Sequence, residues 1–173
     1  MLRFKCVSRF GFGFTLIELM ITVAILALVA AVAIPSFNSL TQVNRLTNSA
    51  NQMLSAFKTA RSEAIKRSQT TQLCPTVNGA TCAEVANWQN WLITVGNEIV
   101  AQGRTVSGIQ VTGPSNTGIF FTSNGLVRDK NGAGMASVMQ VCTTSSSVSE
   151  NTRTLSFVAG GGISITRGAT SCG

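Results

Sequence analysis

Apolar residues form one continuous stretch near the start of the chain, over residues 14–34. These 21 residues carry a single charge, the carboxylate of Glu18. At about 1.5 Å of rise per residue, a helix of this length spans the roughly 30 Å hydrocarbon layer of a membrane. The pattern therefore predicts a membrane-spanning helix over residues 14–34, with an acid close to its start.

A different periodicity follows, in which apolar residues recur every three or four positions. The stripe consists of Val43, Leu46, Ala50, Met53, Phe57, Ala60 and Ala64. This spacing is typical of an amphipathic helix packed on a domain. A coiled-coil seam is the alternative, but the stripe is short and its flanks lack paired charges. We expect one long helix over about residues 14–67, with its amphipathic half at 35–67 and a kink at Pro35, which cannot donate an amide N–H.

After Ser68 the chain consists of short β-prone runs separated by turn residues. Tight turns are expected at Gly96-Asn97 and Asn124-Gly125, and a bend at the glycine run 160–162. That run is not placed between a strand and a helix, so we prefer a turn to a phosphate-binding loop. The expected strands cover residues 70–74, 91–95, 98–102, 108–112, 118–122, 138–143, 154–158 and 162–167. The fold class is therefore α+β, a long N-terminal helix packed on an antiparallel β-sheet head at 68–173.

Composition indicates an exported or membrane-linked protein, because 45% of the 173 residues are apolar and only 11% are charged. Three basic residues, Arg3, Lys5 and Arg9, precede the apolar stretch with no acid among them, which holds its start in the cytoplasm. An ordinary signal peptide cut after Ala33 is the alternative. Glu18 argues against it, because a carboxylate at mid-membrane costs about 2.5 kcal/mol or more and has no use in a discarded segment.

Four cysteines follow the apolar stretch: Cys74, Cys82, Cys142 and Cys172. They allow three disulfide pairings, of which the nearest-neighbour one joins Cys74 to Cys82 and Cys142 to Cys172. A zinc site is the competing interpretation, but no C-x-x-C element and no histidine is present. We expect disulfides, formed in an oxidising compartment, and no metal.

The sequence offers little for catalysis. It has no histidine, and its six acids show no paired spacing. We therefore expect a non-enzyme with no catalytic residues and no cofactor. Trp88 and Trp91 could form an exposed contact, but tryptophans beside Leu92 are more often part of a core.

The segment Gly13-Phe14-Thr15-Leu16-Ile17-Glu18, between a short basic leader and an apolar helix, resembles the N-terminal signature of type IV prepilins and type II secretion pseudopilins. The resemblance implies that residues 1–13 are a leader, that prepilin peptidase cuts between Gly13 and Phe14, and that the new Phe14 amine is methylated. It also gives Glu18 a partner, the Phe14 amine of a neighbouring subunit, so that an ion pair fixes the register between helices. The alternative places the Glu18 side chain near the headgroups.

The stretch over residues 121–127 and the C-terminal hairpin resemble the head of the GspH/FimT family, which includes minor pilins of the FimU kind. Cys172 is similar to the disulfide-bounded terminal loop of many type IV pilins. The resemblance implies a structural minor pilin that primes pilus assembly and links a tip complex to the major pilin. Its partners would be major and minor pilins, through the N-terminal helix, and the inner membrane before assembly. Its location would be the inner membrane, with a periplasmic head, and then the cell-surface pilus.

Two alternatives stay open. One is a DNA-binding minor pilin for DNA uptake, with Arg153 and Arg167 as candidate contacts. DNA-binding members are expected to end in a Gly-Arg-x-Arg motif, and this chain offers only Thr166-Arg167-Gly168. The other is a GspH-like pseudopilin of type II secretion.

Overall fold

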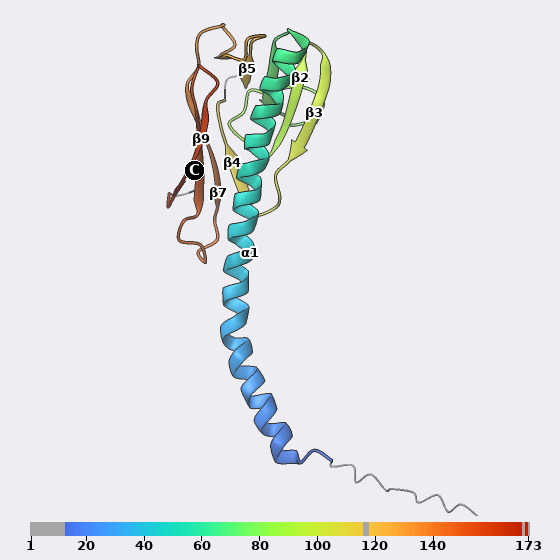
Figure 1. The fold of residues 1–173 in the computed structure, drawn as a ribbon, viewed down its shortest axis with the longest axis vertical. Coiled ribbons are helices and arrows are strands. Elements are labelled where there is room, and N and C mark those ends of the chain that lie inside the picture. The colour runs from blue at the N-terminus through green and yellow to red at the C-terminus, as the bar shows by residue number, and fades with distance from the viewer. Residues whose placement is uncertain (1–12, 116–117, 171, 173) are drawn as a thin grey trace, which may run out of the picture. The chain divides into compact units, whose positions relative to one another are not determined.

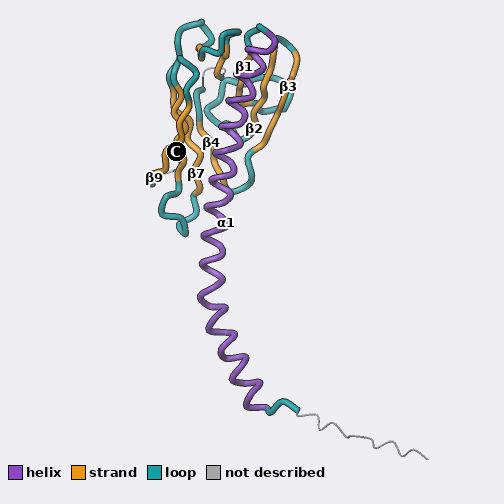
Figure 2. Tube along the Cα trace, viewed as in Figure 1, coloured by secondary structure: helices purple, strands orange, loops and turns teal. Residues whose placement is uncertain are grey.

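The computed structural model describes residues 13–115, 118–170 and 172, which contain one helix and nine strands. Helix α1 runs from Leu16 to Arg67 and contributes residues to two compact units, Met1–Asn38 and Ser39–Gly173. The strands all lie in the second unit (Figures 1 and 2). Their bounds are β1 Thr71–Pro75, β2 Asn90–Val95, β3 Glu98–Arg104, β4 Ile109–Thr112, β5 Ile119–Phe121, β6 Val127–Arg128, β7 Ser137–Thr143, β8 Thr152–Phe157 and β9 Ile163–Gly168.

The strands form two antiparallel sheets. One has the order β3-β2-β1-β5-β6 and the other the order β4-β7-β8-β9. The α+β class is confirmed, and each of the eight expected strands is present within a few residues of its expected bounds. Two features differ from the expectation: the head contains two sheets, and the two-residue strand β6 was not foreseen. Alternation within a strand tells which side chains share a face, but it does not tell which strands pair.

The apolar stripe of α1 forms the centre of the core in the second unit. All its members from Leu46 to Ala64 are buried, whereas Val43 is partly exposed. Figure 1 shows the last turns of α1 alongside both sheets. The side chains packed with the stripe are Leu73, Ile93, Ile119, Phe121 and Val127 from the first sheet and Ile109, Val111, Met139, Val141, Leu155 and Phe157 from the second. The core interpretation of the stripe is therefore confirmed over these residues.

Phe57 connects the helix to both sheets. Its ring centroid lies 4.8 Å from that of Phe121 in an edge-to-face arrangement and 5.6 Å from that of Phe157. Edge-to-face pairs align the positive ring edge with the negative ring face, which adds about 0.5–1.5 kcal/mol to the burial of the rings. A single side chain on α1 thus holds β5 and β8 against the same helical turn.

The two tryptophans belong to the core, as the sequence indicated. Trp88 is fully buried and Trp91 is 6% exposed. The Trp88 indole Nε1–H donates to the carbonyl of Pro114 at 3.0 Å, which satisfies its polar atom inside the head.

Helix α1 is followed directly by a residue in the left-handed conformation, Ser68, whose φ is 52°. The Gln69 N–H donates to the Ala64 carbonyl and the Ser68 N–H to the Ile65 carbonyl, at 3.2 and 3.3 Å. These two bonds form a Schellman motif, which satisfies carbonyls that the end of a helix otherwise leaves free.

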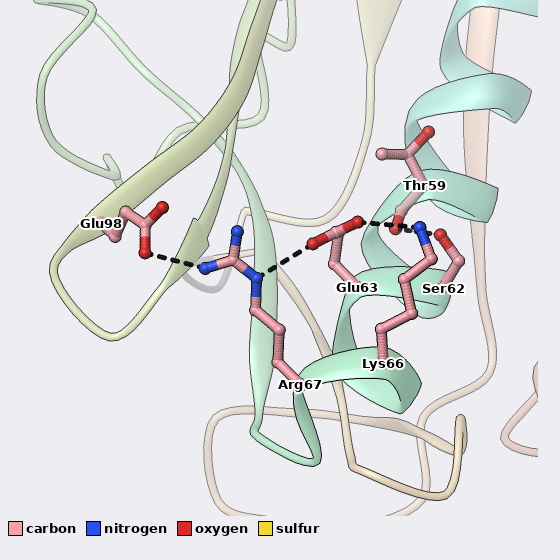
Figure 3. A network of polar contacts seen from close by, with 6 residues as sticks. All are labelled: Thr59, Ser62, Glu63, Lys66, Arg67 and Glu98. Atoms are coloured by element: carbon pink, nitrogen blue, oxygen red, sulfur yellow. Dashed lines mark hydrogen bonds and ion pairs between the residues drawn. The ribbon is translucent and has the colours of Figure 1, made fainter.

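Ion pairs connect the last turns of α1 to the β2–β3 hairpin (Figure 3). The Arg67 guanidinium donates to Glu63 at 3.0 Å and to Glu98 at 2.7 Å, and Lys66 lies 3.4 Å from Glu63. Hydrogen bonds from Arg67 and then Lys66 lower the pKa of the Glu63 carboxyl, and the bonds to Glu98 and Glu63 raise the pKa of Arg67. The network holds the hairpin, turned at Gly96-Asn97, against the end of the helix.

Arg61 joins two turns that are distant in sequence. Its Nη1 donates to the carbonyl of Gly161 at 2.9 Å. A Cβ placed on Gly125 would lie 3.0 Å from the Arg61 Nε, and one on Gly161 would lie 2.7 Å from the Arg61 Cζ. Both glycines have positive φ, 76° and 78°. The expected turns at Asn124-Gly125 and at residues 160–162 therefore exist, and they meet around one helix side chain.

Candidate assembly site

The first turn of α1 begins with a side-chain cap. The Thr15 Oγ1 accepts a hydrogen bond from the Glu18 N–H at 3.3 Å, and the Thr15 carbonyl accepts one from the Leu19 N–H at 3.2 Å. Thr-x-x-Glu is the sequence of a capping box, with Thr15 at the N-cap and Glu18 three residues later. An acid in the first turn is also favoured by the helix dipole. The sequence reasoning missed this cap, although the Thr-x-x-Glu spacing was visible in the chain.

Glu18 is exposed and forms no ion pair with any residue that the structure describes. Its carboxylate therefore projects from a surface that is otherwise apolar. An acid on such a surface is available to a positively charged group outside the chain. The register role of Glu18 stays a prediction.

Gly13 and Phe14 precede the cap. A Cβ built on Gly13 would meet no atom within 4 Å, and its φ is not in the left-handed region. Phe14 is 84% exposed. Packing in the described part of the chain therefore does not require glycine at position 13. The rest of the expected leader, residues 1–12, lies outside the described residues.

The first half of α1 exposes nearly all of its large apolar side chains. They are Leu16, Ile17, Leu19, Met20, Ile21, Val23, Ile25, Leu26, Leu28, Val29, Val32 and Ile34. By length and composition, α1 is able to cross a membrane. The Thr22 hydroxyl donates to the Leu19 carbonyl at 2.8 Å, so this polar group is satisfied within the helix. The helix continues through Pro35, and the kink expected there stays a prediction.

The structure brings Arg153 and Arg167 together but exposes only one of them. They are register partners on β8 and β9. Arg153 is 4% exposed, and its Nη1 donates to the carbonyls of Glu150 and Thr152, both at 2.9 Å. Burial, and then the positive charge of Arg167, lowers the pKa of the Arg153 guanidinium. The Arg153 side chain is thus bound to backbone carbonyls of nearby residues, which leaves Arg167 as the accessible member of the expected DNA-contacting pair.

Both disulfides of the nearest-neighbour pairing are present in the structure. Cys74 in β1 is joined to Cys82 across a separation of 8 residues, and Cys142 in β7 to Cys172 across 30. The second bond ties the C-terminal segment to the four-stranded sheet. The Thr152 Oγ1 also donates to the Thr170 carbonyl at 3.2 Å, close to the same bond in sequence.

A hollow with a volume of about 460 Å³ lies beside the Cys74–Cys82 loop. Thr76, Asn90, Gln102 and Arg104 supply its polar lining. None of these side chains is a nucleophile paired with a base, and the described residues contain no group of three or more His, Cys, Asp or Glu side chains that could hold a metal. The chemistry available there is hydrogen bonding.

The sequence profile of the family described as Type II transport protein GspH matches residues 49–167. The chain belongs to this GspH family. A second profile, the prokaryotic N-terminal methylation motif, matches residues 12–34 and so includes Gly13, Phe14 and Glu18. The GspH match contains the last part of α1 and nearly all of the strands of the head, and the methylation-motif match contains the apolar half of α1.

Curated sequences and solved structures show further similarities. Two sequences named Fimbrial protein, from Pseudomonas aeruginosa, are each 49% identical over 53 residues, which is 31% of this chain and about a third (34%) of their own length. The type IV minor pilin FimU of Pseudomonas aeruginosa PAO1 has a similar fold in two crystal forms. The TM-scores are 0.55 and 0.52, the identities 18% and 16%, and the matches cover 73% and 69% of this chain and 92% and 91% of FimU. The likeness to FimU shows that this GspH-family chain has the fold of pilin structural proteins.

Proposed function

We propose that this GspH-family chain is a structural minor pilin of a type IV pilus. It would enter the filament through the apolar half of α1, help prime assembly, and link a tip complex to the major pilin. The observation that carries the proposal is the first half of α1, an exposed apolar helix with one exposed acid, Glu18, in its first turn. Such a surface needs either lipid or other apolar helices around it.

Processing follows from the same segment. Prepilin peptidase would cut between Gly13 and Phe14, and the new amine would be methylated. Support comes from the match to the methylation motif and from Gly13 itself, because a Cβ on this residue would meet no described atom within 4 Å and packing therefore does not explain the glycine. Before assembly the chain would sit in the inner membrane with its head in the periplasm, where the disulfides form. After assembly it would lie in the cell-surface pilus among major and minor pilins.

The N-terminal residue of the protein isolated from cells tests this proposal. We expect a mature chain that begins with methylated Phe14 and is recovered in sheared filaments. A chain that begins at residue 34, recovered as a soluble periplasmic head, would overturn it. Mutating Gly13 to a bulky residue gives a matched control, because it should block processing while the head remains folded and disulfide-bonded.

DNA uptake is the second candidate function. It rests on the exposed Arg167, since the buried Arg153 is held by backbone carbonyls. Binding through phosphates weakens steeply as salt is added. A gel shift of the full chain in detergent, compared with an Arg167→Gln variant at two salt concentrations, tests this candidate.

A third candidate is a pseudopilin of type II secretion, which the description of the GspH family favours. Recovery of the chain with pilus subunits or with secretion pseudopilins, after crosslinking in cells, distinguishes the two systems. In either system we propose a structural role without catalysis, which the GspH family match and the likeness to the fold of a minor pilin support.

A further inference from the structure

Three Asn-Gly pairs occur in the head: Asn78-Gly79, Asn124-Gly125 and Asn131-Gly132. All three asparagines are exposed. In such a pair the backbone nitrogen of glycine can attack the side-chain carbonyl carbon of asparagine, because glycine has no side chain to hinder the approach. The same dipeptide therefore occurs in three environments that can be compared directly.

The backbone nitrogen of each of the three glycines, which would be the attacking atom, donates one hydrogen bond. The Gly79 N–H donates to the Thr76 hydroxyl at 3.0 Å. The Gly125 N–H donates to the Thr122 carbonyl at 2.8 Å, and the Gly132 N–H to the Asp129 carbonyl at 3.1 Å. A hydrogen bond from each nitrogen slows the attack at all three sites, so the nitrogen does not distinguish them.

The three asparagine side chains differ in the hydrogen bonds that they make. The Asn78 Oδ1 accepts hydrogen bonds from the Ala80 and Thr81 N–H groups, both at 2.9 Å, and its Nδ2 donates to the Thr81 hydroxyl at 3.0 Å. The Asn124 Oδ1 accepts a hydrogen bond from the Thr122 hydroxyl. The Asn131 side chain makes no hydrogen bond to any described residue. The Asp129 carboxylate accepts a hydrogen bond at 2.9 Å from the backbone N–H of Asn131 and not from its side chain. Only the Asn131 amide is free to turn toward the following nitrogen.

We propose that Asn131 is a site of spontaneous deamidation, and that it reacts before Asn78 and Asn124. The Gly132 nitrogen loses its proton and forms a bond to the Asn131 Cγ, while the bond from Cγ to Nδ2 breaks and ammonia leaves with that proton. One water molecule then opens the cyclic imide, giving an aspartyl or isoaspartyl residue. The new negative charge lies in the loop between β6 and β7, next to Asp129 and the Lys130–Glu84 ion pair, whose atoms are 3.1 Å apart. The proposal does not depend on the assembly role.

Mass spectrometry of the full chain tests the order of reaction. The chain is held folded in detergent at mildly alkaline pH, sampled over days, and digested at low pH to suppress further reaction. We expect the acidic form of the Asn131 peptide to accumulate several-fold faster than the acidic forms of the other two peptides. In reduced chain unfolded in urea, the three rates should become similar. Equal rates in the folded chain, or faster reaction at Asn78 or Asn124, would overturn the proposal.

A Thr122→Val variant tests the cause. It removes the hydroxyl that binds Asn124 and keeps the Thr122 carbonyl that binds the Gly125 nitrogen. Asn124 should then react at a rate close to that of Asn131, while Asn78 stays slow. Circular dichroism during incubation confirms that the variant remains folded, and an unchanged Asn124 rate in folded protein would contradict the role of the side-chain bond.

Discussion

At the scale of single residues, Gly161 lies at the point where its own turn and the Gly125 turn meet the Arg61 side chain of α1. Its φ is 78°, and a Cβ there would lie 2.7 Å from both the Arg61 Cζ and the Gly125 carbonyl oxygen. The Gly161→Ala substitution should lower the free energy of unfolding by about 2 kcal/mol, because it combines backbone strain with a contact that the Gly125 backbone cannot relieve. Urea unfolding of the full chain in detergent measures the change.

Gly160 supplies the matched control for that prediction. It has no positive φ, and a Cβ on it would meet no atom within 4 Å. Gly160→Ala should change stability by no more than about 0.5 kcal/mol. Equal losses at the two positions would show that the junction with Arg61 does not stabilise the head.

The sequence did not predict the surroundings of two arginine side chains, Arg153 and Arg61. The expected strand began at residue 154, and Arg153, near the last hairpin, was a candidate contact for DNA. The observed β8 begins at Thr152, so Arg153 shares the inward face with Leu155 and Phe157 and is buried. Arg61 was missed for another reason: only the folded chain brings the Gly125 and Gly161 turns to it.

At the scale of elements, the sequence predicted the helix and most strands because their signals are local. The apolar period of α1 and the turn residues around β2 and β3 lie within short stretches. The division into two sheets could not be read in this way. It depends on pairs distant in sequence, such as β1 with β5 and β4 with β7. Strand β6 has only two residues, Val127 and Arg128, which is too short for an alternation to be recognised.

The two disulfides should differ in the stability that they give. In the chain-entropy estimate, a bond across 30 residues stabilises by about 3.7 kcal/mol and one across 8 residues by about 2.6 kcal/mol. A Cys142→Ala/Cys172→Ala variant should therefore lose about 1 kcal/mol more than a Cys74→Ala/Cys82→Ala variant. Urea unfolding of both variants measures the difference. Non-reducing peptide mapping of the native chain comes first, and free thiols at all four positions would contradict both the pairing and export.

The ion-pair network at the end of α1 predicts an acid-sensitive contribution. The folded-state pKa of Glu63 is lowered, mainly by its hydrogen bond to Arg67. A lowered carboxyl pKa stabilises the fold above the unfolded-state pKa, and this contribution is lost as the pH falls through the folded-state pKa. Glu63→Gln should thus lower the unfolding temperature slightly near neutral pH and have no effect in strong acid. Glu98→Gln is the matched comparison, with a smaller expected effect because the Glu98 side chain is 64% exposed.

At the scale of the whole molecule, the chain combines a unit that buries its apolar side chains from water with a unit that exposes them. The second unit buries its apolar stripe under two sheets and is closed by two disulfides. The first unit buries none of its apolar side chains in the described chain. The stability of the head and the assembly of the helix should therefore respond to different substitutions.

Glu18 tests this separation, because an acid at that position has two possible explanations. In one, the charge pairs with the amine of a neighbouring subunit. In the other, the carboxylate only completes the capping box that the Thr15-x-x-Glu18 sequence allows, beside the hydrogen bond from the Glu18 backbone N–H to the Thr15 hydroxyl. Glu18→Ala should leave membrane insertion and head unfolding unchanged while reducing incorporation into filaments strongly.

The variants Glu18→Gln and Thr15→Val distinguish the two explanations. Glutamine can occupy the same place in a capping box without the charge, whereas valine at 15 removes the cap and keeps the carboxylate. If the charge sets the register, Glu18→Gln should fail in sheared-filament assays as Glu18→Ala does, and Thr15→Val should assemble. The reverse outcome would assign the acid to helix capping. Normal incorporation of Glu18→Ala itself would remove any assembly role for this side chain.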